Sequence, residues 1–128
     1  MGVFCGVDMV EIERVKDSID KLGESFIQRI FTPAEIEYCE NRRSGKYESY
    51  TARFAAKEAI SKALGTGFTQ GVGLKGIELI ATESGKPEVI LHGRTKERFI
   101  SMGGTAIEIS MTHCRDYAVA FAVIQTKD

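Results

Sequence analysis

The sequence predicts an α+β domain in which an antiparallel β-sheet packs with a long central helix and several shorter helices. Helical spacing of apolar residues dominates the first half of the chain, and two pairs of strand-like runs dominate the second half. No repeat or low-complexity linker divides the 128 residues. A chain of this size can bury one core unaided, so we treat residues 1–128 as a single domain.

The N-terminal part of the chain begins with a strand and continues with helices. Residues 3–9 form a short apolar run that predicts a strand, and Asp8 lies near its end. Residues 10–22 carry one apolar stripe at helical spacing, after which Gly23 provides a stop signal. Residues 25–31 predict a short helical turn. The stripe consists of Ile12, Val15, Ile19 and Leu22.

The strongest helix start in the chain is the sequence TPAE at positions 32–35. Its threonine can cap the helix, its proline suits the first helical position, and its glutamate completes a capping box. We expect this helix to end near Arg43 and residues 44–46 to form a loop. Residues 48–64 then predict the long central helix, which Gly65 ends.

Two hairpins and one helix are predicted in the second half. The first hairpin joins residues 77–82 to residues 88–92 through a turn that contains Gly and Pro. The second hairpin joins residues 105–111 to residues 117–124, and apolar residues alternate along both of its strands. A short helix at residues 95–102 lies between the hairpins. This arrangement supports the predicted antiparallel sheet.

Composition limits the class of protein. Hydrophobic residues make up 43% and charged residues 27%, which is typical of a soluble globular protein. The formal net charge of −1 gives no global attraction to nucleic acid or to a membrane, so we expect neither as a partner. The three cysteines are scattered and odd in number, which disfavours a disulfide framework or a zinc site. With no signal peptide evident at the N-terminus, we expect a cytoplasmic protein.

Asp8 allows two interpretations. An aspartate between a strand and a helix commonly caps the helix, and the residue type alone favours that structural role. A carboxylate at the end of a rigid strand is also well placed to bind a hard cation such as Mg²⁺.

The central helix carries many charges in the stretch RFAAKEAISKALGTG, residues 53–67. Glu58 and Lys62 are four residues apart and share one side of the helix, and as a solvated pair they would contribute only about 0.2–0.5 kcal/mol. Arg53 and Lys57 add two more cations. Together the three cations could meet several phosphate oxygens, with Glu58 anchoring a bridging Mg²⁺. The spacing alone does not decide between surface charges and a binding site.

His113 ends a predicted strand and is followed directly by Cys114. A lone histidine is more often structural than catalytic. Adjacent residues of a strand point to opposite faces, so we do not favour a cysteine–histidine nucleophile.

Four segments of the chain resemble holo-acyl-carrier-protein synthase, the small trimeric class of 4′-phosphopantetheinyl transferases. GVDMVEIER at 6–14 resembles the opening GxDxxxxxR pattern, and the stretch at 53–67 resembles the signature helix (W/F)xxKExxxK. SGKPEV at 84–89 resembles the GKP turn, and SMTHCRDYAVAFAV at 110–123 resembles the SHxxxxAxA-like ending, although many members read differently just before His113. The segments follow the family order and span nearly the whole chain.

The resemblance implies an enzyme that transfers the 4′-phosphopantetheine arm of coenzyme A to a serine of an apo acyl carrier protein, in support of fatty acid biosynthesis. It implies Asp8 and Glu58 as Mg²⁺ ligands and Lys62 as a contact to the pyrophosphate, and these three residues are the expected catalytic set. The expected coenzyme-A-binding residues are Arg53, Lys57, Ser61, Lys62, Gly65, Ser84, Gly85, Lys86, Pro87 and His113. The resemblance also implies a homotrimer, with the turn at 84–87 approaching the adenosine from a neighbouring subunit.

This chemistry agrees with the residue types. Phosphoryl transfer depends mainly on positioning and on neutralising the phosphate charge, which one Mg²⁺ and nearby lysines can do. The general base stays open between Glu58, a metal-bound water and Asp116. Two other functions also stay open: a non-catalytic coenzyme A or nucleotide sensor, and another Mg²⁺-dependent enzyme that cleaves pyrophosphate. The paired carboxylates argue against the sensor, and the small number of carboxylates argues against the second enzyme.

Two surfaces are expected to contact protein partners. Carrier proteins of this pathway are acidic, so a local basic patch must attract them, and Arg14 belongs to the family motif. Arg14 and Lys21 are seven residues apart and face the same way on a helix. The other cations available for this patch are Arg29, Arg42 and Arg43. The last hairpin has apolar character on more than one face, so some of Ile107, Ile109, Phe121 and Val123 are expected in a subunit interface.

Overall fold

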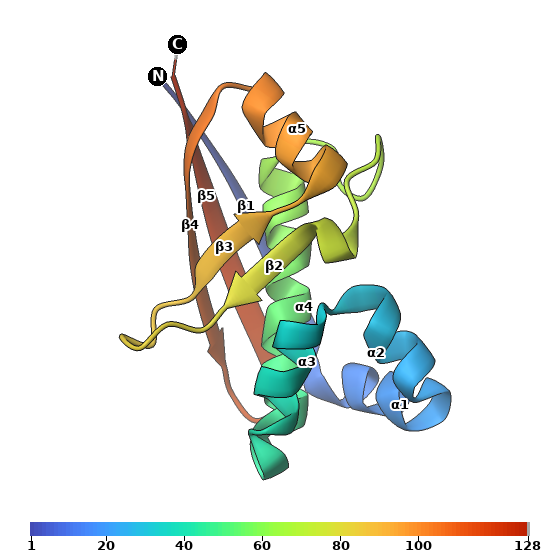
Figure 1. The fold of residues 1–128 in the computed structure, drawn as a ribbon. Coiled ribbons are helices and arrows are strands. Elements are labelled where there is room, and N and C mark those ends of the chain that lie inside the picture. The colour runs from blue at the N-terminus through green and yellow to red at the C-terminus, as the bar shows by residue number, and fades with distance from the viewer. Residues whose placement is uncertain (128) are drawn as a thin grey trace.

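The computed structural model describes residues 1–127 and confirms the predicted α+β fold (Figure 1). The helices are α1 (Ile12–Leu22), α2 (Glu24–Ile30), α3 (Pro33–Glu40), α4 (Lys46–Ala63) and α5 (Gly93–Ser101). The strands are β1 (Gly2–Glu11), β2 (Ile77–Ile80), β3 (Glu88–Leu91), β4 (Gly104–His113) and β5 (Tyr117–Thr126). Two short 3₁₀ turns, η1 (Arg43–Gly45) and η2 (Leu74–Gly76), precede α4 and β2.

A three-stranded antiparallel sheet in the order β1-β5-β4 forms one layer, and α4 runs along its inner face (Figure 1). The central strand β5 pairs with β1 from Gly2 opposite Thr126 to Glu11 opposite Tyr117, so the two chain ends lie together. Because β1 and β4 are the two edges of the sheet, they border opposite flanks of α4. This separation decides which residues can share a cavity.

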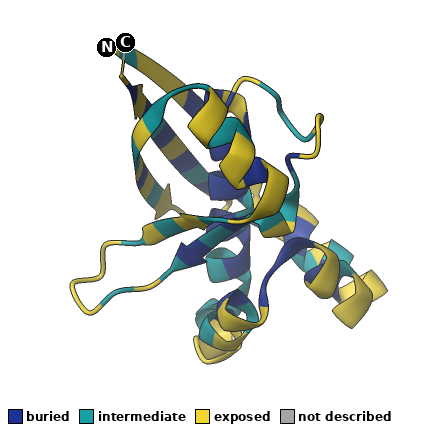
Figure 2. Ribbon diagram, turned by 45° about the horizontal axis from the view of Figure 1, so that its top comes forward, coloured by how far each residue is buried: buried dark blue, intermediate teal, exposed yellow. Residues whose placement is uncertain are grey.

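Small side chains fill the contact between α4 and the sheet, and Figure 2 shows the buried residues along both elements. The buried alanines are Ala118, Ala120 and Ala122 of β5, and Ala55, Ala56, Ala59 and Ala63 of α4. Close packing of such short side chains lets the helix lie near the backbone of the sheet. The position of α4 therefore depends on close backbone contact.

The remaining elements cover the other sides of α4 (Figure 1). The strands β2 and β3 pair only with each other, so the predicted sheet is in fact two antiparallel sheets. The helices α1, α2 and α3 pack around the first half of α4 and enclose a second apolar cluster. The rings of Phe31 and Tyr50 lie at its centre, with centroids 4.9 Å apart.

The structure confirms the capping box at α3 and corrects several element bounds. The Thr32 hydroxyl accepts a hydrogen bond from the Glu35 backbone nitrogen, and the Glu35 carboxylate accepts one from the Thr32 backbone nitrogen. The helix ends at Glu40, earlier than predicted, and all of the expected loop at 44–46 belongs to η1 and the start of α4. The first strand continues to Glu11, and α1 begins only after it.

The outer face of the three-stranded sheet is apolar and exposed. Val3, Val7 and Met9 of β1 are 64%, 53% and 63% exposed, and Phe121 of β5 is 45% exposed. These residues occupy alternate positions, which places them on the face opposite α4. Ile107 and Ile109 instead belong to the core beside α4. Within residues 1–127, no helix is both long and apolar enough to cross a membrane.

Candidate active site

Asp8 and Glu58 come together from distant parts of the sequence. Both line a cavity of about 390 Å³ between β1, α1 and α4. The hypothesis that Asp8 caps the first helix is wrong, because α1 begins after Glu11 and has no side-chain cap. The cavity is lined by Asp8, Met9, Val10, Arg14, Val15, Ser18, Phe26, Phe54 and Glu58.

Gly6 allows β1 to approach α4 closely at this point. A Cβ atom at Gly6 would overlap the carbonyl oxygen of Ala59 and would lie 3.0 Å from the backbone nitrogen of Ala63. Both are backbone atoms of α4, so they cannot move aside unless the helix moves. The glycine of the GVD sequence therefore sets the short distance between strand and helix that brings Asp8 near Glu58.

Lys62 lies at the edge of this acidic pair, one helical turn beyond Glu58. Its Nζ donates a hydrogen bond to the carbonyl oxygen of Val7 at 2.9 Å and lies 3.3 Å from Oδ1 of Asp8. The Lys62 side chain is 51% exposed. Because the side chain is not enclosed by the protein, its ammonium group can turn toward the phosphate of a ligand.

The electrostatics of the pair favour a bound cation. Burial raises the pKa of Glu58 above its usual value, the nearby charge of Asp8 raises it further, and Lys62 opposes both. No cluster of three or more histidine, cysteine or acidic side chains suited to a metal occurs in the described part of the chain. Two carboxylates alone suit Mg²⁺, which keeps several waters and takes other oxygens from substrate phosphates. The residues present therefore fit this ion.

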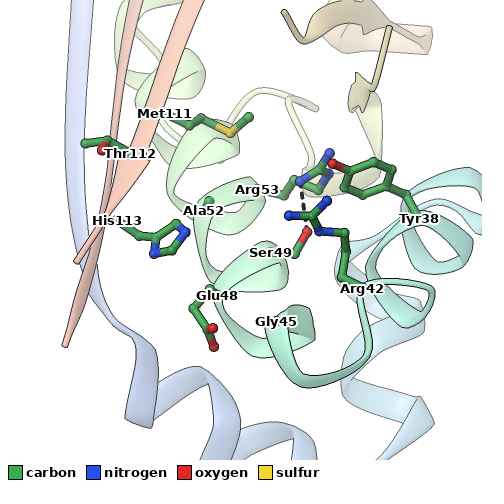
Figure 3. Close-up of a pocket in the computed structure, with 10 residues that line it drawn as sticks. All are labelled: Tyr38, Arg42, Gly45, Glu48, Ser49, Ala52, Arg53, Met111, Thr112 and His113. Atoms are coloured by element: carbon green, nitrogen blue, oxygen red, sulfur yellow. Dashed lines mark hydrogen bonds between the residues drawn. The ribbon is translucent and has the colours of Figure 1, made fainter. Parts of the chain in front are cut away.

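A second cavity, of about 300 Å³, lies on the opposite flank of α4, beside β4. Figure 3 shows Arg42 and Arg53 beside Tyr38, and His113 extending from β4 toward the same space. The residues that line it are Tyr38, Arg42, Gly45, Glu48, Ser49, Ala52, Arg53, Met111, Thr112 and His113. The structure thus brings together Arg53 and His113, two of the predicted coenzyme-A-binding residues.

Arg53 is held rigidly in this basic cavity. Its guanidinium carbon lies 4.1 Å from the centre of the Tyr38 ring, and its Nη1 donates a hydrogen bond to the Ser49 hydroxyl at 3.1 Å. The buried Nε of Arg53 has no hydrogen-bond partner within the described chain. A guanidinium has five N–H donors, of which the Ser49 hydroxyl takes one, so the part of Arg53 that lines the cavity is suited to an anion such as a phosphate.

The three cations that could have met several phosphate oxygens together do not share one side of the central helix. Arg53 and Glu58 are five residues apart, so their side chains differ in direction by about 140° around the helix. Arg53 lines the cavity beside β4, whereas Glu58 lines the cavity beside β1. Only Lys62 accompanies Glu58 on its side.

Lys57 is not available to a ligand, and its predicted role in coenzyme A binding is wrong in this structure. Its side chain is fully buried and forms an ion pair of 2.8 Å with the fully buried Glu35. Burial lowers the pKa of Lys57, and the charge of Glu35 opposes that shift. Lys57 therefore has a structural role, although it is adjacent in the sequence to Glu58, which lines the acidic cavity.

Ser61 and Gly65 lie at the last turn of α4. The Ser61 hydroxyl donates a hydrogen bond to the carbonyl oxygen of Glu58 at 2.7 Å, within its own helix. Gly65 is exposed and has a φ of 81°, a conformation that favours glycine. The helix therefore ends in a backbone that a ligand can approach, and a direct contact to either residue stays a prediction.

The predicted GKP turn forms the tip of the β2–β3 hairpin, which extends away from the body of the domain (Figure 1). Ser84, Gly85 and Lys86 are exposed, and Pro87 is half-buried. The Nζ of Lys86 lies 2.6 Å from a carboxylate oxygen of Glu108 on β4. The turn thus lies on the same side of the sheet as the basic cavity, far from Asp8 on β1.

Some residues of these cavities were not predicted as parts of a site. Tyr38 carries no sequence signal for a site, and Arg42 has only that of a surface cation, because their proximity to Arg53 depends on how α3 packs on α4. Glu35 was interpreted only as part of a capping box. The sequence signal for a partner of Glu35 is Lys57 itself, a lysine that lies within the alanine-rich stretch of the central helix.

The chain belongs to the 4′-phosphopantetheinyl transferase superfamily, whose model matches residues 4–122. The family is the one that the sequence motifs resemble, so that prediction is confirmed.

The chain is also similar to particular proteins over its whole length. A holo-[acyl-carrier-protein] synthase of Ruminiclostridium cellulolyticum is 48% identical over 128 residues, which are 100% of this chain and 96% of the relative. One of Maridesulfovibrio salexigens is 47% identical over 98% of this chain and 99% of its own length.

Solved structures agree with these relatives. The holo-[acyl-carrier-protein] synthase of Neisseria meningitidis superposes with a TM-score of 0.87 at 30% identity, covering 96% of this chain and 98% of its own. The Helicobacter pylori enzyme in complex with coenzyme A superposes with a TM-score of 0.84 at 27% identity, covering 94% and 99% of the two chains.

Proposed function

We propose that this enzyme transfers the 4′-phosphopantetheine arm from coenzyme A to a serine of apo acyl carrier protein, and thereby supports fatty acid biosynthesis. The observation that carries the proposal is the meeting of Asp8 and Glu58 in one cavity, with Lys62 at its edge. These three residues come from the two motifs that distinguish the family, and they lie far apart in the sequence.

Asp8 and Glu58 are the residues that would hold Mg²⁺ in this cavity. When bound, the ion supplies positive charge to the phosphate oxygens and lowers the cost of their developing negative charge. Lys62 contributes a second positive charge from the edge of the cavity. The serine hydroxyl attacks the β-phosphorus of coenzyme A and gives up its proton to a general base. The bond between the β-phosphorus and the bridging oxygen breaks, and adenosine 3′,5′-bisphosphate leaves with that oxygen.

The basic cavity is suited to the nucleotide end of coenzyme A. Arg53 offers an unused buried donor, Arg42 adds positive charge, and His113 faces the same space. The adenosine of coenzyme A carries phosphates, which match these donors. We assign to this cavity the anchoring of the leaving group, and to the cavity of Asp8 the chemistry.

We further propose a homotrimer in which each active site lies between two copies. The exposed outer face of the sheet is apolar at alternate positions of β1 and β5, and a second copy would remove this surface from water. Such contacts between identical chains can place the β4 side of one copy next to the β1 side of another. The two cavities and the turn at 84–87 would then act on one coenzyme A molecule.

The carrier protein is proposed to dock beside the acidic cavity, where Arg14 lies exposed on α1. Carrier proteins of this pathway are acidic, so Arg14 offers a complementary charge at the entrance to the site. We propose a cytoplasmic location, which the three free cysteines of the described chain support.

The experiment that tests the function is incubation with coenzyme A, Mg²⁺ and several purified apo carrier proteins, followed by mass spectrometry. The proposal predicts that a carrier gains the mass of one phosphopantetheine arm, and that adenosine 3′,5′-bisphosphate forms in equal amount. Tight binding of coenzyme A without any mass gain would instead identify a sensor. Release of the bisphosphate in the absence of a carrier would identify a pyrophosphate-cleaving enzyme.

A further inference from the structure

The ammonium group of Lys57 uses all of its hydrogen-bonding capacity inside the protein. Its Nζ donates to Oε1 of Glu35 at 2.8 Å and to the carbonyl oxygens of Leu74 and Ile77 at 2.9 and 2.6 Å. An ammonium has three N–H donors, so none is left for a ligand. Lys57 therefore connects α4 to η2 and to the start of β2.

The carboxylate of Glu35 is held just as completely. Its Oε1 also accepts a hydrogen bond from the backbone nitrogen of Thr32, and its Oε2 accepts one from the backbone nitrogen of Leu79 at 2.8 Å. The Glu35–Lys57 pair thus ties three elements, α3, β2 and α4, at one buried point. Removal of either partner would leave an uncompensated charge in the interior.

The polar contacts continue from this pair to the surface. The Thr32 hydroxyl donates to Oε2 of Glu78 at 2.5 Å, and Oε1 of Glu78 lies 2.9 Å from Nε2 of the half-exposed His92. These contacts begin at Lys57 on α4 and end at His92, the residue before α5. They therefore fix the position of the Glu35–Lys57 pair on the side of α4 that faces α3 and β2.

The direction of Lys57 also determines the direction of Glu58. The two residues are adjacent in one helix, so their side chains leave the axis about 100° apart. The buried apolar surface of α4 consists of several alanines together with the larger side chains of Tyr50 and Ile60, and these side chains hold the helix by apolar packing. Apolar packing is not directional, so a buried ion pair with directional hydrogen bonds adds a constraint on the rotation of the helix that this packing lacks.

We propose that Lys57 is a positioning residue for the reaction: the Glu35–Lys57 pair fixes the rotation of α4, and thereby holds the Glu58 carboxylate at the distance from Asp8 that one divalent cation requires. The proposal rests on the metal-binding role assigned to Glu58 under the proposed function. It concerns residues that make no contact with the cation or with coenzyme A.

The test measures binding of Mn²⁺, a spectroscopic probe for the Mg²⁺ site, to the full chain in the presence of coenzyme A and without carrier protein. The variants are Lys57→Met, the double variant Lys57→Met/Glu35→Gln, Glu58→Gln, and Leu79→Ala. Leu79→Ala is the matched control, because it disturbs the packing of β2 in the same layer but leaves the ion pair intact. Thermal unfolding midpoints are recorded for every variant.

We expect Lys57→Met to raise the Kd for Mn²⁺ by about tenfold, the effect usual for groups that orient a metal ligand. The double variant removes the unpaired buried charge, so its unfolding midpoint recovers relative to Lys57→Met, but its Kd for Mn²⁺ stays about tenfold raised. Leu79→Ala lowers the midpoint and leaves the Kd unchanged. The double variant keeps the test decisive even where Lys57→Met alone does not fold.

A wild-type Kd in the double variant, together with weak binding by Glu58→Gln, would overturn the positioning role and leave the metal site intact. If Leu79→Ala raised the Kd for Mn²⁺ as much as the double variant does, the positioning role would also be overturned, because loss of stability alone would then explain the weaker binding. Wild-type binding by Glu58→Gln would show that the metal site itself is wrong, and the positioning role would be overturned with it.

Discussion

The two cavities that flank α4 differ in charge, rigidity and position. The cavity beside β1 contains the paired carboxylates of Asp8 and Glu58, with the half-exposed cation of Lys62 at its edge. The cavity beside β4 contains Arg53, stacked on Tyr38 and buried with an unused donor. The first has the properties of a reaction centre, and the second has the properties of an anchor. One chain contains both but separates them by the width of a helix.

The largest expected effect comes from neutralising the acidic cavity. Glu58→Gln keeps the size of the side chain but removes the charge that would hold the cation. We expect kcat for carrier modification to fall by about a hundredfold or more, as when a group that stabilises transition-state charge is lost. Steady-state kinetics at saturating coenzyme A measure this.

The circular dichroism spectrum of Glu58→Gln should match that of the wild type, since the side chain is half-buried and forms no ion pair with any described residue. A Glu58→Gln enzyme with a normal kcat would show that the acidic cavity is not the reaction centre.

A second variant tests whether the approach of β1 to α4 creates that cavity. Gly6→Ala places a methyl group against the backbone of Ala59 and Ala63, so strand and helix must separate and Asp8 must move. We expect a loss of about 1–3 kcal/mol of stability from overpacking. We also expect kcat to fall by about tenfold, because Asp8 would move away from the position in which it can bind Mg²⁺.

Chemical denaturation and kinetics report these two quantities separately for Gly6→Ala. Gly73→Ala is a suitable control, because a Cβ atom there meets open space and the residue lines neither cavity. A Gly6→Ala protein with full activity would mean that the position of Asp8 is unimportant.

The start of α3 and the meeting of Asp8 with Glu58 could be predicted from the sequence, because a capping box and two sequence motifs mark these residues. The TPAE sequence predicted the start of α3 correctly, and the motif residues Asp8 and Glu58 were expected to meet. The division of charges between the flanks of α4 could not be predicted. It depends on which neighbours pack against each side, so the sequence placed both Lys57 and Lys62 at the coenzyme-binding helix, although Lys57 is buried and Lys62 is half-exposed.

The basic cavity should affect binding more than chemistry. Arg53→Ala removes the buried guanidinium and its unused donor. We expect the KM for coenzyme A to rise by about tenfold, because one hydrogen bond to a charged group contributes roughly 1.5–3 kcal/mol. The kcat should change less. Lys75→Ala, at an exposed position outside both cavities, is the control. An unchanged KM would contradict the anchoring role.

The smallest effect is expected at the entrance to the acidic cavity. Arg14→Ala removes one exposed positive charge, and an exposed charge pair contributes only about 0.2–1 kcal/mol. The apparent affinity for carrier protein should fall severalfold at low salt and converge with that of the wild type at high salt. Binding of coenzyme A without carrier should not change.

Arg29→Ala, on α2, is the comparison variant. A carrier affinity that responds to neither Arg14→Ala nor salt would exclude α1 as the docking surface.

We propose that the acidic cavity of one copy and the basic cavity of another form one active site. The most direct measurement mixes two inactive or impaired variants, Glu58→Gln and Arg53→Ala, by co-expression so that mixed assemblies form. In a randomly mixed trimer, sites that combine the intact Glu58 of one chain with the intact Arg53 of its neighbour make up about a quarter of all sites. The account predicts that the mixture regains about a quarter of the wild-type kcat/KM at low coenzyme A. Activity of the co-assembled mixture no higher than the mean of the two separate variants would show that each chain builds its site alone, and would contradict the account.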